Sequence, residues 1–431
     1  MRVEVLNIGT ELLMGFVVNT HASYLGRKLG ELGLRIDRQV GVNDEPADIR
    51  NALSDALQRA ELVITTGGLG PTSDDITRDL VIELLKLPTR VDERVLRDIT
   101  KRFQRHKIAM PESVKVQATV PVDAHVLHNA NGTAPGLAIP LKKSEWKCRM
   151  LVLLPGPPRE LCPMFEDQVL PLLKREWKDL PIVECRMLRT VGLAESLVEE
   201  AVKPVLARHP EVEIGYCARS GEVDVRLVAR GKDAAKIADT MERELREALG
   251  GVVFGNSDEG LQNAVVELLK TRGKTLATAE SCTGGYLAHR ITMVSGSSDV
   301  FQQGWITYAN EAKQERLGVP ADLLKQHGAV SESVARRMAE GARERAKSDY
   351  ALSVTGIAGP TGGTPEKPVG TVYIALATAN GTSVTHALWP MDRETFKFVV
   401  SQTALDMLRR ELLDTMKTPA EKKRDSSLRS E

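Results

Sequence analysis

Residues 62–75 read LVITTGGLGPTSDD, an apolar run followed by a glycine-rich loop and two carboxylates. The run Leu62–Thr66 is typical of a buried strand, and a helix is predicted after the loop, over Asp74–Leu87. The same alternation precedes this stretch, with strands predicted at Val3–Ile8 and Leu34–Val40 and helices at Asn19–Gly33 and Pro46–Ala60. Alternating strands and helices imply a parallel sheet with helices on both faces. The sequence therefore predicts an α/β domain whose ligand site lies in the loops after Ile8 and Thr66, where strands end.

The loop after Thr66 has the composition of an anion site. Gly67, Gly68 and Gly70 let the backbone approach a ligand closely, and Thr72 lies near the amides that begin the next helix. The loop has neither the Gly-Lys-Ser/Thr of a Walker A motif nor the spacing of a dinucleotide-binding loop. We therefore expect these residues to bind substrate phosphates in a different type of site.

Four carboxylates lie on this loop and its neighbours. Asp74 and Asp75 follow the glycines, and Asp44 and Glu11 lie on loops expected nearby. Carboxylate oxygens suit a hard divalent cation, so these residues predict a metal site against a bound pyrophosphate. The alternative is that Asp74 and Asp75 only cap the N-terminus of a helix.

Composition limits the classes of protein to consider. At roughly 100–200 residues per domain, the 431 residues suggest two to four domains. Lys and Arg total 58, as do Asp and Glu, and aromatic residues make up 4%, which argues against direct contact with nucleic acid. No apolar run approaches the roughly 18 residues of a membrane span. Five cysteines without a C-x-x-C spacing fit a reducing compartment. We expect a cytoplasmic protein that contacts neither nucleic acid nor a membrane.

The middle of the chain, residues 178–256, has a different pattern. Strands are predicted at Ile182–Thr190 and Val223–Ala229, and helices at Ala194–Arg208 and Asp233–Leu249. The segment has no glycine-rich loop and no group of residues typical of catalysis. We interpret it as a small α+β connector between a first domain, residues 1–177, and a third, residues 257–414. The last residues, 415–431, are polar and charged and predict a flexible tail.

The third domain returns to the α/β alternation. A helix is predicted at Gly260–Thr271, and strands are predicted at Lys274–Ala279 and Asp349–Thr355. Thr371–Thr378 and Ser383–Leu388 flank the dipeptide Asn380-Gly381, which is typical of a β-hairpin turn. This domain is therefore also expected to contain a sheet covered by helices.

The loop after the strand at 274–279 reads ESCTGG, residues 280–285. It places Ser281 on a strand-to-helix turn, where the hydroxyl is exposed and the amides around 281–285 can stabilise a developing oxyanion. Lys313, at the end of TYANEAK (307–313), is a possible base for this serine. A lysine accepts a proton only when neutral, so its pKa must lie below the usual value of about 10.4.

Other interpretations of this turn remain open. Ser281 is also suited to be a helix N-cap, with a phosphate bound by the glycines. Cys282 is an alternative nucleophile, although no neighbouring residue in the sequence indicates thiolate activation. His289 and His327 fit the role of base less well, because the first is expected on the following helix and the second in a loop.

Motifs of the first domain resemble those of the CinA (competence/damage-inducible) family and its MoaB/MogA-type domain. They are GTELLMG at 9–15, TTGGLGPT at 65–72, NGTAPG at 131–136 and LPGPPRE at 154–160. The resemblance implies a molybdopterin-binding-like fold and, as in some members, ADP-ribose pyrophosphatase activity that depends on a divalent metal. The family often has Gly-Asp-(Asp/Asn) after the second strand. This chain reads VNDE at 42–45, so only Asp44 matches.

Motifs of the third domain resemble the nicotinamide mononucleotide deamidase domain, which is the C-terminal half of CinA. They are AESCTGG at 279–285, YANEAK at 308–313, HGAVS at 327–331, TGIAGP at 355–360 and KPVGTV at 367–372. The resemblance implies that Ser281 is the nucleophile and Lys313 its general base, with no cofactor. It assigns substrate contacts to Thr283, Gly284, Gly285, Tyr308, Asn310, Thr355, Gly356, Gly359 and Arg393. The family commonly has Pro-Gly-Asp-Arg before the last helix, and here Met391 replaces that glycine.

Together the resemblances predict two three-layer α/β domains, one molybdopterin-binding-like and one amidase, joined by a small α+β KH-like domain. The KH-like segment lacks the Gly-x-x-Gly loop of RNA-binding KH domains. We expect a homodimer that acts on nicotinamide mononucleotide and ADP-ribose. The alternative function is a regulatory or protein-binding role linked to competence, with an N-terminal domain that binds a pterin-like ligand without turnover.

Overall fold

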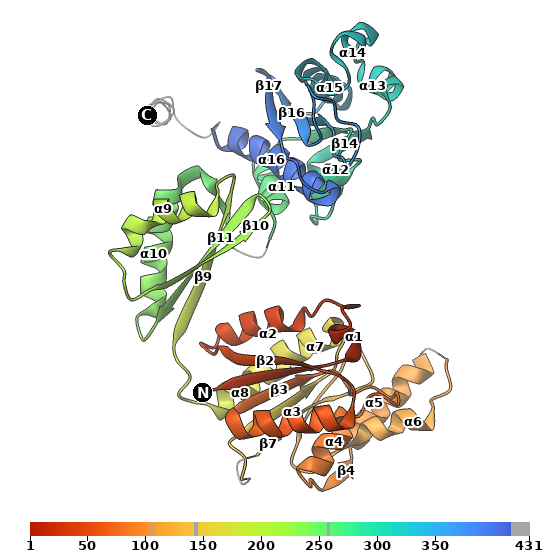
Figure 1. Cartoon of the computed structure of the whole chain (residues 1–431), viewed down its shortest axis with the longest axis vertical. Coiled ribbons are helices and arrows are strands. Elements are labelled where there is room, and N and C mark those ends of the chain that lie inside the picture. The colour runs from red at the N-terminus through yellow and green to blue at the C-terminus, as the bar shows by residue number, and fades with distance from the viewer. Residues whose placement is uncertain (106, 142–144, 257–258, 415–431) are drawn as a thin grey trace. The chain divides into compact units, whose positions relative to one another are not determined.

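The computed structural model describes residues 1–105, 107–141, 145–256 and 259–414, so the tail predicted over 415–431 lies outside the described residues. The chain divides into two compact units (Figure 1). One unit is Met1–Cys185 with Arg230–Ala235, and the other is Arg186–Ala229 with the chain from Lys236 onward. The middle and C-terminal segments, which the sequence separates near residue 256, therefore belong largely to one unit.

The first unit contains a six-stranded sheet in the order β2-β1-β3-β8-β7-β6. The strands are β1 (Val3–Ile8), β2 (Ile36–Val42), β3 (Leu62–Thr66), β6 (His125–Leu127), β7 (Gly136–Pro140) and β8 (Met150–Leu154). The first four strands in that order are parallel, as the alternation predicts, and Leu6 on β1 pairs with Thr65 on β3. β7 and β6 extend the sheet in antiparallel fashion. A separate pair, β4 (Thr89–Val91) and β5 (Thr119–Pro121), forms a small second sheet.

Helices cover both faces of this sheet, because its central strands are apolar on both sides. Val3 and Val5 on β1 face a core with α2, α7 and α8, whereas Leu6 and Ile8 face a core with α3 and α4 (Figure 1). The helices are α1 (Thr10–Leu13), α2 (His21–Gly30), α3 (Pro46–Arg59), α4 (Thr77–Leu84), α5 (Glu93–Arg105), α6 (Glu112–Lys115), α7 (Pro158–Met164) and α8 (Leu170–Glu176). α4 begins three residues later than predicted, because Asp75 accepts hydrogen bonds from Thr72 in a turn before it.

The middle segment has a four-stranded sheet in the order β10-β11-β9-β12. Its elements are β9 (Val183–Val191), α9 (Glu195–Leu206), β10 (Glu213–Arg219), β11 (Glu222–Arg230), α10 (Ala234–Leu249) and β12 (Val253–Gly255). β10 and β11 form an antiparallel hairpin. The expected α+β character is confirmed, and β10 is a strand that the sequence pattern did not reveal.

The C-terminal segment has a five-stranded sheet in the order β14-β13-β15-β16-β17. Its strands are β13 (Leu276–Glu280), β14 (Phe301–Ile306), β15 (Tyr350–Gly356), β16 (Thr371–Thr378) and β17 (Gly381–Leu388). β13 lies between β14 and β15 and is parallel to both, while β16 and β17 form the predicted hairpin. The carboxyl ends of β13, β14 and β15 therefore meet at one edge.

Helices again cover both faces of this sheet, which confirms the predicted three-layer arrangement. Leu276 and Leu352 pack against α11, α12 and α16, and Ala277 and Ala351 pack against α13, α14 and α15. The helices are α11 (Leu261–Thr271), α12 (Tyr286–Thr292), α13 (Asn310–Leu317), α14 (Ala321–His327), α15 (Glu332–Ala346) and α16 (Arg393–Asp414).

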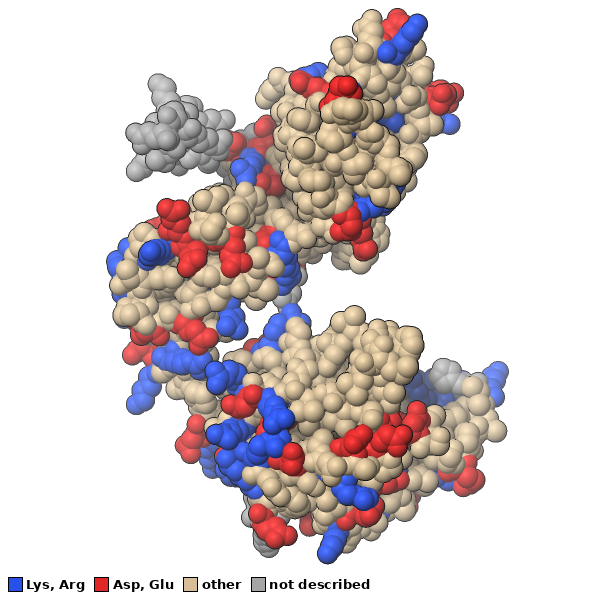
Figure 2. All heavy atoms as spheres, viewed as in Figure 1, with Lys and Arg blue, Asp and Glu red and all other residues tan. Residues whose placement is uncertain are grey.

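The distribution of charged side chains and the character of the helices both bear on the classes of protein that the composition excluded. On the face shown in Figure 2, basic and acidic side chains are interspersed, in keeping with 58 of each kind in the sequence. Within the described ranges, no helix has both the length and the apolar character needed to cross a membrane.

Candidate functional site

The turn after β13 carries Ser281 and is fixed by a buried carboxylate. Glu280 is 1% exposed and accepts hydrogen bonds from the amides of Gly285 (3.0 Å), Leu287 (3.0 Å) and Ala288 (2.8 Å). Gly284 and Gly285 have φ of 60° and 94°, a left-handed conformation that favours glycine. Ser281 itself is held because its amide donates to the carbonyl of Val354 on β15. The serine therefore lies on a rigid strand-to-helix turn, as predicted. It is only 9% exposed, because the side chain of Lys313 packs against it, so the prediction of an exposed hydroxyl is wrong.

Lys313 reaches this turn from the first turn of α13. Its side chain is 1% exposed, and its Nζ lies 3.1 Å from Ser281 Oγ, 2.7 Å from the carbonyl oxygen of Thr307 and 3.2 Å from that of Tyr308. Burial lowers the pKa of Lys313. A neutral amine has two N–H groups and one lone pair. The two carbonyls can accept both N–H groups, which directs the lone pair at the serine hydroxyl.

The amides available to an oxyanion are fewer than the sequence indicates. Those of Ser281, Gly284 and Gly285 donate to Val354, to Ser281 and to the Glu280 carboxylate respectively. Among the described residues, the amides of Cys282 and Thr283 form no such bond. Thr283 is fully buried as a whole residue, and its hydroxyl has no hydrogen-bond partner among the described residues, which leaves the amide of Cys282 as the better placed of the two donors.

Cys282 is a poor alternative nucleophile. Its side chain is buried, and burial raises the pKa of its thiol to about 12. At neutral pH it is therefore a thiol, whereas thiolate is the reactive form.

The other predicted substrate residues gather around the same edge of the sheet. Arg393, the first residue of α16, donates to the carbonyl of Gly359 (2.8 Å) and to the hydroxyl of Tyr308 (3.1 Å). Asn310 is exposed at the start of α13. The hydroxyl of Thr355 donates to the carbonyl of Ala329 (2.7 Å) and is buried.

Close packing explains the glycine at position 356. A Cβ at Gly356 would lie 2.7 Å from the carbonyl oxygen of Thr371, so the backbone of this loop leaves no room for a side chain. Gly356 therefore shapes the loop after β15, and Gly359 supplies the carbonyl that Arg393 binds.

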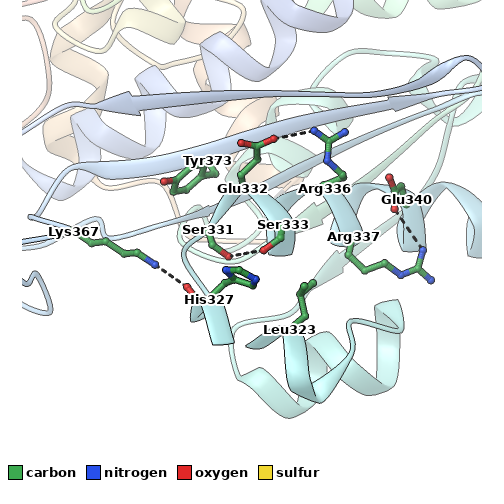
Figure 3. Close-up of a pocket in the computed structure, with 10 residues that line it drawn as sticks. All are labelled: Leu323, His327, Ser331, Glu332, Ser333, Arg336, Arg337, Glu340, Lys367 and Tyr373. Atoms are coloured by element: carbon green, nitrogen blue, oxygen red, sulfur yellow. Dashed lines mark hydrogen bonds and ion pairs between the residues drawn. The ribbon is translucent and has the colours of Figure 1, made fainter. Parts of the chain in front are cut away.

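A separate cavity of about 620 Å³ lies beside α14 and the N-terminal half of α15 (Figure 3). Its lining includes neither Ser281 nor Lys313. Arg336 pairs with Glu332 (2.9 Å), and Lys367 donates to the carbonyls of His327 (2.8 Å) and Val330 (2.7 Å). These bonds attach the loop around Lys367 to the end of α14 and to the loop before α15, and His327 lines this cavity, whereas Ser281 does not.

A cavity of about 660 Å³ in the first unit collects most of the predicted N-terminal site residues. It is lined by Gly67, Gly68 and Gly70 and by the carboxylates of Glu11, Asp44, Asp74 and Asp75. Thr72 is not part of the lining, because its amide and hydroxyl donate to Asp75. The cavity also includes Arg102, which the sequence did not single out, and Asn131 and Arg159, which lie in the motifs at 131–136 and 154–160 but had no predicted role.

The four carboxylates share this cavity without forming a closed metal cage. In the described ranges, no three His, Cys, Asp or Glu side chains are close enough to hold one ion. Asp44 accepts a hydrogen bond from the amide of Thr10 (2.8 Å), and the neighbouring Thr72 hydroxyl lowers the pKa of Asp74. Mg²⁺ is usually held by one or two carboxylates together with water and substrate phosphates. The donor set fits an ion shared with a substrate pyrophosphate.

His21 is a lining residue that sequence reasoning missed. Asn7 Nδ2 donates to Thr66 Oγ1 (2.8 Å), and that hydroxyl lies 3.2 Å from His21 Nδ1. Burial lowers the pKa of His21, so the ring is neutral at pH 7. Since Thr66 receives the Asn7 donor, its own proton is directed at the histidine. The histidine begins α2, and nothing in its local sequence predicts that it contacts the end of β3.

Family models cover nearly the whole chain. The model described as "Probable molybdopterin binding domain" matches residues 4–175, "Damage-inducible protein CinA KH domain" matches 185–255, and "CinA C-terminal domain" matches 258–412. A solved structure of competence/damage inducible protein CihA from Agrobacterium tumefaciens is 41% identical, and the match covers 35% of this chain and 94% of that chain with a TM-score of 0.33.

Full-length relatives agree with these models. A CinA-like protein from Akkermansia muciniphila is 48% identical over 406 residues, which is 94% of this chain and 96% of that protein. A CinA-like protein from Kosmotoga olearia is 42% identical over 417 residues, which is 96% of this chain and 99% of that protein. The chain therefore belongs to the CinA family, with a probable molybdopterin-binding domain, a KH domain and a CinA C-terminal domain in that order.

Proposed function

We propose that the C-terminal domain hydrolyses the carboxamide of nicotinamide mononucleotide to nicotinate mononucleotide and ammonia. The observation that carries the proposal is the buried amine of Lys313 at 3.1 Å from the hydroxyl of Ser281. A serine needs a base to become a nucleophile, and a lysine with a lowered pKa can act as that base without a histidine or metal.

The chemistry proceeds through an acyl-enzyme. Ser281 Oγ attacks the carboxamide carbon, and its proton moves to Lys313, while the amide of Cys282 donates to the oxygen that becomes negative. The C–N bond then breaks, and Lys313 returns the proton to the leaving nitrogen as ammonia departs. Water attacks the ester at Ser281 and gives a proton to Lys313, which passes it back to Ser281 Oγ as the acid is released.

Arg393 supports a substrate with a phosphate group. Its guanidinium donates to two neutral groups, the Gly359 carbonyl and the Tyr308 hydroxyl, so its positive charge remains available to an anion. Burial raises the pKa of the Cys282 thiol, and the positive charge of Arg393 lowers it. Arg393 therefore lies near the catalytic turn. A mononucleotide phosphate suits this position.

A labelled-water experiment tests the proposal. The protein is incubated with nicotinamide mononucleotide in H₂¹⁸O, and the expected product is nicotinate mononucleotide with one ¹⁸O in its carboxylate, together with equimolar ammonia. Nicotinamide and ribose 5-phosphate as products would instead indicate cleavage of the glycosidic bond and would contradict the proposal.

For the N-terminal domain we propose hydrolysis of ADP-ribose to AMP and ribose 5-phosphate. The support is the cavity that combines glycine backbone at Gly67–Gly70 with the four carboxylates. The glycine amides would bind the pyrophosphate, and Asp44, Asp74, Asp75 and Glu11 would hold a hydrated divalent ion. When bound, that ion would neutralise phosphate charge and polarise the bond to be broken. Formation of AMP from ADP-ribose with Mg²⁺ or Mn²⁺ tests this activity, and no AMP with either would refute it.

A cytoplasmic location and a homodimer are part of the same proposal. The five cysteines are all free thiols, which suits a reducing compartment. Light scattering on the purified chain tests the dimer, and a monomer mass would contradict it.

A further inference from the structure

Charged and amide side chains are buried where the middle sheet meets the helices of the C-terminal domain, within the second unit. We call this group the interdomain cluster: Arg189 on β9, Glu222 and Asp224 on β11, Arg290 on α12 and Gln402 on α16. All five residues are at most 6% exposed. Buried charges are costly unless they are paired. Within the middle domain Arg189 pairs with Glu222 and Asp224, and Arg219 also pairs with Asp224 (2.7 Å), so Arg290 is the cation that the C-terminal domain brings to the cluster.

Hydrogen bonds run through the interdomain cluster in a fixed order. Arg290 Nη2 donates to Gln402 Oε1 (2.6 Å), and Gln402 Nε2 donates to Glu222 Oε1. The second oxygen of Glu222 accepts from Arg189. Gln402 can bond in this way in only one amide orientation, because its oxygen faces a donor and its nitrogen faces an acceptor. The amide thereby connects the negative charge of Glu222 to the positive charge of Arg290.

Arg290 depends on this indirect connection. Its other partners are neutral: Ser401 Oγ (2.8 Å), Gln262 Oε1 (2.8 Å) and the ring of Phe398, whose centroid lies 4.9 Å from Arg290 Cζ. Among the described residues, no carboxylate forms an ion pair with it. Burial lowers the pKa of Arg290 to about 10, and the negative charge of Glu222 opposes that change. Glu222 is therefore the carboxylate of the cluster that stabilises the Arg290 cation.

Arg290 lies on the helix that begins at the catalytic turn. α12 starts at Tyr286, directly after Gly284 and Gly285, and Glu280 binds amides of its first turn. A displacement of α12 at Arg290 would therefore move Ser281. The distance between Ser281 and Lys313 determines the rate of proton transfer between them. We propose that Glu222, acting through Gln402 and Arg290, is a positioning residue for Ser281, so that the middle domain is a functional part of the deamidase. The inference rests on the proposed function of the C-terminal domain.

The test compares Glu222→Gln with a rescue variant in the full-length protein. Glu222→Gln keeps the shape but removes the charge, and we expect kcat to fall about tenfold with KM unchanged, since a 1 Å misplacement can cost roughly 100-fold. Glu222→Gln combined with Gln402→Glu places the carboxylate directly on Arg290 and is expected to restore kcat to within about threefold of wild type. A purely structural role would lower the melting temperature and leave kcat unchanged, and that result would overturn the proposal.

Arg409→Lys is the matched control. Arg409 on α16 donates to the carbonyl of Gly251 (2.6 Å), so it joins the same two domains, and its hydrogen bonds to described residues go to Gly251, Val253 and Asp406 and not to α12. It pairs with Asp406 and is 1% exposed. We expect this variant to lower the melting temperature while kcat stays near wild type. An equal loss of kcat in Arg409→Lys and Glu222→Gln would show that any loosening of the domains slows the enzyme, and would refute the specific role of Glu222.

A fluorophosphonate probe separates this inference from the proposed substrate. Ser281 Oγ would attack phosphorus, the P–F bond would break with loss of fluoride, and the serine proton would move to Lys313. The rate of labelling reports the reactivity of Ser281 independently of nicotinamide mononucleotide. We expect labelling of Glu222→Gln to be about tenfold slower than that of wild type. If wild type is labelled but releases no ammonia, the proposed function fails, while slower labelling of the variant still supports the positioning role. Equal labelling rates for wild type and Glu222→Gln, both folded, would overturn the positioning role of Glu222.

Discussion

Lys313 Nζ lies 3.1 Å from Ser281 Oγ, although the two residues are 32 positions apart in the sequence. The parallel pairing of β13 with β14 brings the two residues together. Ser281 follows β13, Lys313 follows β14 after a short loop, and the amide of Thr307 donates to the carbonyl of Glu280 (2.8 Å), which holds the two loops together. The predictions below depend on this pair and on the turn that supports it.

The pair predicts a pH dependence of deamidation. Burial lowers the pKa of Lys313 from its usual 10.5, and the lysine is active only when neutral. Below its lowered pKa the amine is protonated, so kcat/KM should fall about tenfold for each further pH unit and reach a plateau above that pKa. Initial rates of ammonia release across pH 6–10 measure this profile. A flat profile in a protein that stays folded would exclude Lys313 as the base.

Lys313→Arg tests the same role without a change of pH. A guanidinium keeps its proton at any workable pH, so it cannot accept one from Ser281. We expect deamidation to fall by at least about 100-fold, the lower end of the contribution of a general base. Lys325→Arg on α14 is the control for the substitution itself and should retain wild-type rates. Substantial turnover by Lys313→Arg would mean that the lysine only orients the substrate.

Glu280→Gln tests the support of the catalytic turn. The carboxylate accepts three backbone amides, and an amide side chain can replace only part of that capacity. We expect the free energy of unfolding to fall by about 1–3 kcal/mol and kcat to fall by at least about tenfold. Thermal unfolding and ammonia release measure the two effects. Unchanged values of both would show that Glu280 does not hold the turn in solution.

The two proposed activities should respond differently to metal removal. The N-terminal cavity offers carboxylates for a hard cation, whereas the Ser281–Lys313 chemistry needs none. A chelator should stop ADP-ribose hydrolysis and leave deamidation largely intact, and Asp74→Ala with Asp75→Ala should give the same separation. AMP and ammonia are measured in parallel. Equal loss of both activities on chelation of a folded protein would contradict two independent sites.

The sequence predicted the parts of the structure that depend on local pattern. Short apolar runs located β1 and β3, and the glycines at 284 and 285 located the catalytic turn. Arg290 and Glu222 were not recognised, because an isolated charge in a sequence is expected at the surface. Their burial arises only when α12, α16 and β11 come together. The contact of His21 with Thr66 was missed for the same reason, since it joins residues 45 positions apart.

Ammonia release from nicotinamide mononucleotide by the purified protein and by Ser281→Ala tests the central claim most directly. We expect steady release by wild type, and no release above the uncatalysed rate by Ser281→Ala, whose circular dichroism should match that of wild type. Cys282→Ala serves as the neighbouring control and should retain activity, because the Cys282 thiol is protonated and buried. Release of ammonia by Ser281→Ala at the wild-type rate would contradict the account.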